Sequence, residues 1–116
     1  MNENPRQYTE DEIRKIFIRQ IWAELAWWEK ESRAVTVREK LEGLAFSILA
    51  TIDGDSAIPG FYMVPCVAPG DKAYYIENGE NWYPESPQKD LEKLCDIGGN
   101  LHEVFHELNP EKGNAI

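Results

Sequence analysis

Apolar residues recur at helical spacing from Thr36 to Gly54, and both ends of this segment carry helix boundary signals. Thr36 and Glu39 form a T-x-x-E capping box, which satisfies two amide donors at a helix start. Gly54 follows Asp53 and accepts the left-handed conformation that ends helices. Apolar residues also occupy part of the opposite side, a pattern typical of a buried helix. The sequence therefore predicts a central buried helix over residues 37–53, with an apolar face made of Leu41, Leu44, Ala45, Ile48, Leu49 and Ile52.

A second amphipathic pattern precedes the central helix and predicts a long helix from Thr9 to about Ser32. Thr9 and Glu12 repeat the T-x-x-E box. The short connection between the two helices suits antiparallel neighbours. Three tryptophans crowd the end of this first helix. They either cover the central helix or anchor a partner, because Trp is enriched at binding hot spots. The expected apolar face consists of Ile13, Ile16, Phe17, Ile21, Leu25 and Trp28, and the other two tryptophans are Trp22 and Trp27.

After Gly54 the spacing of apolar residues changes from a helical to an alternating one. Residues 61–68 and 72–78 alternate aromatic and β-branched side chains across two faces, as strands do. Pro69 and Gly70 between them fit a tight turn. The sequence therefore predicts a small antiparallel hairpin or short sheet packed on three main helices. The expected fold class is α+β.

A last helix is expected after the hairpin. Ser86 is its predicted N-cap, with Pro87 in the first turn. The helix runs towards Leu108, and the pair Gly98-Gly99 leaves open whether it is broken. The expected domain organisation is a disordered arm over 1–8, a single α+β domain over 9–109 and a flexible tail over 110–116.

Charge and composition limit the classes of partner. The chain of 116 residues has 21 acids against 12 bases and a net charge of −9, and most of the excess lies in residues 54–116. Such a field repels phosphate backbones, which argues against nucleic acid as a partner. The central helix is too short to span a bilayer, which takes about 20 residues, so no membrane partner is expected. Two cysteines and a polar, acidic N-terminal segment favour a cytoplasmic location.

The last helix contains the sequence His102-Glu-Val-Phe-His106, which matches the H-E-x-x-H motif of zinc metallopeptidases. Two His at i and i+4 can share a Zn²⁺, and Glu103 between them can act as general base. A third protein ligand is missing, since Glu107 and Glu111 are the only acids after His106. A helical wheel also places both His near the polar edge of the helix. We therefore interpret the segment as a solvent-facing amphipathic helix, with a zinc-dependent hydrolase as the alternative.

One further motif has a simple structural interpretation. The string Asp53-Gly54-Asp55-Ser56 offers oxygen ligands, but it lacks the spaced acids and closing Glu of a calcium loop. We interpret it as a helix C-cap and turn.

Four strings distributed along the chain resemble a family of small uncharacterised bacterial proteins, some from phage or prophage contexts. The resemblance covers about residues 36–108 and implies no known activity, cofactor or catalytic residue. In that family the Leu-His-Glu step recurs more reliably than a full H-E-x-x-H. The strings are Glu42–Gly54, Pro59-Gly-Phe61, Gly79-Glu-Asn-Trp82 and Leu101-His-Glu103.

These patterns favour a small, non-enzymatic intracellular protein that binds another protein or a second copy of itself. No catalytic residue, metal ligand or cofactor is favoured. The alternative uses Glu103 as general base and His102 and His106 as zinc ligands. The expected interaction surface consists of Trp22, Trp27, Trp82 and Tyr83.

Overall fold

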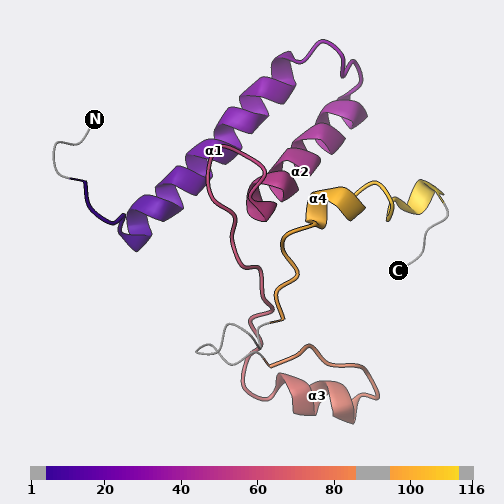
Figure 1. Cartoon of the computed structure of the whole chain (residues 1–116). Helices are drawn as coiled ribbons and strands as arrows, with labels where there is room; N and C mark the ends of the chain where they lie inside the picture. The colour runs from indigo at the N-terminus through magenta and orange to yellow at the C-terminus, as the bar shows by residue number, and fades with distance from the viewer. Residues whose placement is uncertain (1–4, 86–94, 113–116) are drawn as a thin grey trace. The chain divides into compact units, whose positions relative to one another are not determined.

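The computed structural model describes residues 5–85 and 95–112. The chain divides into two compact units, Met1–Leu49 and Ala50–Ile116. No strand occurs among the described residues, so the predicted α+β class and its hairpin are wrong, and the described chain is helical (Figure 1). The elements in order are α1 (Glu10–Lys30), α2 (Val37–Asp53), α3 (Asp71–Glu77), α4 (Leu101–Val104) and the short 3-10 helix η2 (Pro110–Lys112).

Helix α1 begins at the predicted capping box. The Glu12 amide donates to Thr9 Oγ1 at 3.2 Å, and the Thr9 amide donates to Glu12 Oε1 at 2.9 Å. Arg6 adds a bidentate pair to the same carboxylate at 2.8 and 3.0 Å. The first turn is acidic throughout, which complements the positive end of the helix dipole. The prediction of this helix start is confirmed.

Helices α1 and α2 lie antiparallel, side by side (Figure 1). Trp28 is one residue that joins them. Its ring rests on Gly43, where a Cβ atom would lie 2.5 Å from ring carbons Cε3 and Cη2. Its indole Nε1 donates to Ser47 Oγ at 2.7 Å. A glycine inside a helix lowers helix stability by about 1 kcal/mol relative to Ala. Here the absence of a side chain at Gly43 leaves the space into which the Trp28 indole fits.

The lysine one turn earlier on α2 closes the C-terminal end of α1. Lys40 Nζ donates to the carbonyl oxygens of Trp28, Glu29 and Glu31 at 3.1, 3.0 and 3.0 Å. The last carbonyls of a helix have no partner within the helix and carry partial negative charge. The Lys40 ammonium group gives these carbonyls hydrogen-bond donors and also offsets their partial negative charge.

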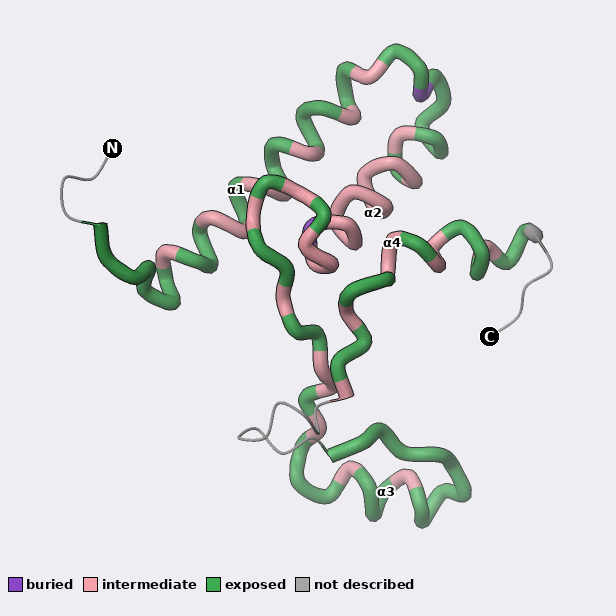
Figure 2. The backbone as a smooth tube through the Cα atoms, viewed as in Figure 1, coloured by how far each residue is buried: buried purple, intermediate pink, exposed green. Residues whose placement is uncertain are grey.

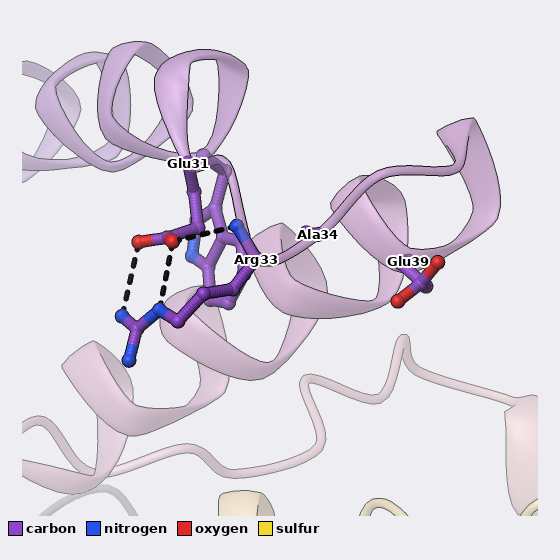
Figure 3. A pocket seen from close by; sticks show the side chains of 5 residues that line it. Glu31, Arg33, Ala34 and Glu39 are labelled. Atoms are coloured by element: carbon purple, nitrogen blue, oxygen red, sulfur yellow. Dashed lines mark hydrogen bonds and ion pairs between the residues drawn. The ribbon is translucent and has the colours of Figure 1, made fainter.

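The turn between the helices surrounds a hollow of about 400 Å³ (Figure 3). Arg33 pairs with Glu31 through Nε at 2.8 Å and Nη2 at 3.0 Å. The Arg33 side chain and amide hold the pKa of Glu31 at about 2. Ala34, which also lines the hollow, is buried. Glu39 lines the hollow and keeps its predicted role, since its amide donates to Thr36 Oγ1 at 3.0 Å.

Helix α2 has the predicted bounds, but it is not a fully buried helix. Of the described residues, only Ala34 and Thr51 are buried (Figure 2). Leu44, Ile48 and Ile52, which belong to the predicted apolar face, are only half-buried. Leu41 is 58% exposed.

These apolar residues stay half-buried because a different side of α2 faces α1. The contacts come from Lys40, Gly43 and Ser47, which lie at i, i+3 and i+7 on one side of the helix. Ile48 follows Ser47 by one residue and so points about 100° away. The apolar stripe that periodicity identified is therefore turned from α1. Periodicity found the stripe but not its partner.

In the second unit, the first predicted strand is an extended segment without a ladder partner in the described part of the chain. Its hydrogen bonds go to loops and to a helix end. Met63 N donates to Asp96 Oδ1 at 2.8 Å, and Met63 O accepts from Ile97 N at 2.8 Å. Phe61 N donates to Ile52 O at 2.9 Å. These isolated bonds position the segment without forming a sheet.

The second predicted strand, residues 72–78, is helix α3 instead. Gly70, with φ of 91°, precedes it, and Asp71 Oδ2 accepts from the Ala68 amide at 2.9 Å. Asn78 closes the helix through its side chain, which donates to Tyr74 O at 2.8 Å. These local bonds at both ends outweigh the β preference of the aromatic side chains. Among the described helices, none has the length and apolarity that a membrane span requires.

Substituting Gly43 with Ala should destabilise the protein, although Ala is the better helix former. The added methyl collides with the Trp28 ring, and overpacking of this kind costs about 1–3 kcal/mol. In a Trp28→Ala background the collision is absent, and the same substitution should stabilise by up to about 1 kcal/mol. Urea unfolding followed by far-UV circular dichroism gives both values. Stabilisation in both backgrounds would contradict the packing of Trp28 on Gly43.

Candidate functional site

The carboxylate of Asp53, the last residue of α2, makes several hydrogen bonds within the described part of the second unit. Its side chain is fully shielded from solvent. Oδ1 accepts from the Gly99 amide at 2.7 Å, and Oδ2 accepts from the His102 amide at 2.8 Å. Gly54, with φ of 93°, turns the chain directly after Asp53. The carboxylate is thus held at a bend by residues far along the sequence.

These bonds make Asp53 the cap of α4. The residue at the N-cap position, Asn100, makes no side-chain capping bond. The amides at the start of α4 need acceptors, and a carboxylate suits the positive end of a helix. Asp53 supplies that acceptor from a different helix.

The imidazole of His102 lies between two carboxylates. Nδ1 is 2.6 Å from Asp53 Oδ2, and Nε2 is 2.9 Å from Asp55 Oδ2. A carboxylate only accepts hydrogen bonds, so the ring makes both bonds only when both nitrogens carry hydrogen. The His102 side chain is 14% exposed, whereas that of Asp55 is 63% exposed. The arrangement therefore favours a shielded imidazolium.

The pKa values of the pair shift in opposite directions. The hydrogen bond to Asp53 is the largest influence on His102 and raises its pKa above 6.5, partial burial opposes the rise, and the Asp55 charge adds to it. Burial is the largest influence on Asp53 and acts to raise its pKa. Taken together, the hydrogen bonds from the His102 side chain and from backbone amides outweigh the effect of burial. The pKa of Asp53 is therefore lowered.

This geometry differs from the helix predicted around the H-E-x-x-H motif. Helix α4 ends at Val104, before the second His, and the glycine pair precedes α4 instead of interrupting it. The predicted cap at Ser86 and Pro87 falls outside the described residues. His102 is also not solvent-facing, because it turns towards Asp53.

The residues of the alternative zinc site are not arranged as a ligand set. Both nitrogens of His102 already contact carboxylates. The ring of His106 stands edge-on to Phe105, with 5.0 Å between centroids, and Glu103 is exposed. Within residues 5–85 and 95–112, no three His, Cys, Asp or Glu side chains are grouped to hold a metal ion. A metal at His102 would have to replace the proton through which a ring nitrogen bonds an aspartate.

The four aromatic residues expected to form an interaction surface are all exposed. Trp22 and Trp27 on α1 are 65% and 51% exposed, and Trp27 stands edge-on to Trp28 with centroids 4.8 Å apart. In the second unit, Trp82 and Tyr83 are 48% and 59% exposed. Lys72 Nζ lies 5.4 Å from the Trp82 ring centroid, within range of a cation–π contact. Their role in binding stays a prediction.

Sequence reasoning missed the Asp53–His102–Asp55 cluster. Asp53 and Asp55 were assigned to a cap and turn, which is correct locally, but their shared partner His102 follows 49 and 47 residues later. The available signal was that both histidines of the chain lie in its strongly acidic second half. A hollow of about 330 Å³ lies beside the cluster, lined by Asp53, Gly60, Phe61, Tyr62, Asp96 and Gly99.

Comparison with known proteins gives no relative: no family model, no curated protein and no solved structure matches the chain.

Protonation of His102 should stabilise the fold. A pKa raised by folding gives a contribution that is complete below about pH 6.5 and is lost as the pH rises through the folded-state pKa. Asp53 acts oppositely: its contribution is present above about pH 4 and is lost as the pH falls through its lowered pKa. Proton NMR titration of the His102 ring, assigned with a His106→Gln variant, should give a pKa above 6.5. Asp53→Asn should bring that pKa down, and an unchanged value would contradict the pairing.

Proposed function

We propose that this chain is a non-enzymatic, intracellular protein-interaction module that works by binding another protein or a second copy of itself. The observation that supports it best is the exposure of large apolar side chains on ordered helices. Trp22 on α1 and Tyr74 on α3 are each exposed by more than 60%. Contiguous apolar surface on a folded protein marks an interaction site, and Trp and Tyr dominate binding hot spots.

Exposed apolar side chains occur in both units, and those of the first unit lie on α1 and around the start of α2. On α1, Ile13, Ile18 and Leu25 are exposed by 43%, 49% and 38% in addition to the tryptophans. Val35, Val37 and Leu41 are exposed by 78%, 74% and 58% around the start of α2. Water around such groups is released when a partner covers them, which favours association.

Charge supports a protein partner over a nucleic acid. A net charge of −9 repels a phosphate backbone. Two cysteines in 116 residues suit a reducing compartment, which supports an intracellular location.

The His102 cluster supports a structural role over catalysis. Asp53 bonds both the ring and the main chain of the α4 start, so its carboxylate is committed to holding the fold. The proposal includes no cofactor and no catalytic residue.

Covalent capture tests the proposed function. A photoreactive benzoylphenylalanine replacing Trp22 or Trp82 should give discrete crosslinked adducts in extracts of cells that produce the protein. Excess wild-type protein should remove these adducts by competition, and Trp22→Ala protein should compete less well at the first position. The matched control carries benzoylphenylalanine in place of Lys30, which is also exposed on α1. Equal labelling at Lys30, or no discrete adduct at any position, would reject the proposal.

Metal content gives a second test. After extensive dialysis, the purified protein should retain far less than one zinc per chain, because both nitrogens of His102 bond carboxylates. Elemental analysis measures this directly. About one zinc per chain, lost in both His102→Ala and His106→Ala, would replace the binding proposal with a zinc hydrolase.

A further inference from the structure

Five residues of α1 form a stripe with alternating spacings of three and four. The central three, Ile18, Trp22 and Leu25, are exposed by 49%, 65% and 38%. Lys15 precedes them and Glu29 follows them on the same side of the helix. Spacings of three and four keep side chains on one narrow face, the kind that pairs with another helix.

This face is not the one that holds α2. Trp28 packs on Gly43 and bonds Ser47. Trp22 lies six residues before Trp28, so it projects about 120° away around the helix axis. The packing of α2 against α1 therefore leaves the stripe without a covering helix in the first unit.

The two ends of the stripe carry opposite charges at equal distances from its centre. Lys15 and Glu29 are each seven residues from Trp22, about 10 Å along the axis. Lys15 Nζ lies 3.2 Å from Asp11 Oδ2 within the same helix, and both side chains are more than 60% exposed. An exposed pair of this kind contributes little, so Lys15 can exchange or share its partner.

We propose that the stripe binds the same stripe of a second copy of this chain, with the two α1 helices antiparallel and a two-fold axis at Trp22. This inference rests on the proposed function and names its partner. In that arrangement Lys15 lies opposite Glu29 of the second copy, and Ile18 lies opposite Leu25 of the second copy. The two-fold axis makes every such contact occur twice.

Charge selects both the orientation and the partner. In a parallel pair, Lys15 would face the second copy's Lys15, and Glu29 its Glu29, so like charges would repel at both ends. In the antiparallel pair both ends attract. The face is thus complementary to itself only when one copy is reversed, which is what a symmetric dimer needs.

One helix face about 20 Å long is smaller than a standard protein interface. We therefore expect a reversible dimer with a dissociation constant in the micromolar range. Trp22 at the centre should carry much of the affinity, as large aromatic side chains do at interface centres.

Charge reversal in the full-length chain tests the register. Lys15→Glu and Glu29→Lys should each weaken dimerisation about tenfold or more in analytical ultracentrifugation, because each places like charges at both ends. The double variant carrying both substitutions should restore the wild-type constant. Trp22→Ala should weaken the dimer at least as much. Lys30→Glu makes the same charge change about 80° around the helix from Trp22 and should leave the constant unchanged.

Mixing the two single variants gives the sharpest result. Each repels itself, but Lys15→Glu protein offers acids at both positions and Glu29→Lys protein offers bases at both. An equimolar mixture should therefore form heterodimers more tightly than either variant forms homodimers. Circular dichroism confirms that each variant is folded.

Three outcomes would overturn the proposal: a monomer at every concentration, a dimer unaffected by the reversals, or a mixture that does not pair. A monomer that still gives competed adducts at Trp22 with another protein would reject self-pairing and leave the proposed binding function standing. A monomer without adducts would reject both.

Discussion

The close approach of Trp28 to Gly43 decides how the first unit is built. The indole fits only because residue 43 has no side chain, and its bond to Ser47 fixes the ring on that side of α2. Lys40, on the same side, then reaches the carbonyls that end α1. Once this side of α2 faces α1, the apolar stripe of α2 must face elsewhere. The outer face of α1 is left uncovered by α2 for the same geometric reason.

The second unit depends on a charge in an unusual place. A carboxylate at the C-terminal end of a helix is unfavourable, because that end is already partly negative. Asp53 occupies this position on α2 and is offset by the Gly99 and His102 amides and by the His102 ring. The end of one helix therefore specifies the start of another. This explains why α4 forms without a capping side chain of its own.

Sequence reasoning succeeded where the determinants are local. The boxes at Thr9 and Thr36 and the stop at Gly54 act within four residues, and the starts of α1 and α2 and the end of α2 were predicted correctly. It failed for residues 72–78, where alternating aromatics indicated a strand but Asp71 and Asn78 bond the ends of a helix. It also failed for the partner of Asp53, since sequence spacing does not show which distant segment meets a helix end. Gly43, a glycine inside a helix, was the one available sign of the close contact with Trp28.

The cap that Asp53 provides has a consequence for synthesis. The contacts within α1 and between α1 and α2 described above lie between Thr9 and Ser47, so they are complete early in translation. Asp53 emerges soon afterwards, but its donors at Gly99 and His102 follow 46 and 49 residues later. At about 5–20 residues per second, a ribosome takes roughly 2–10 s to make that stretch. During this interval the nascent chain carries a finished helical hairpin whose final acidic residue still awaits its donors.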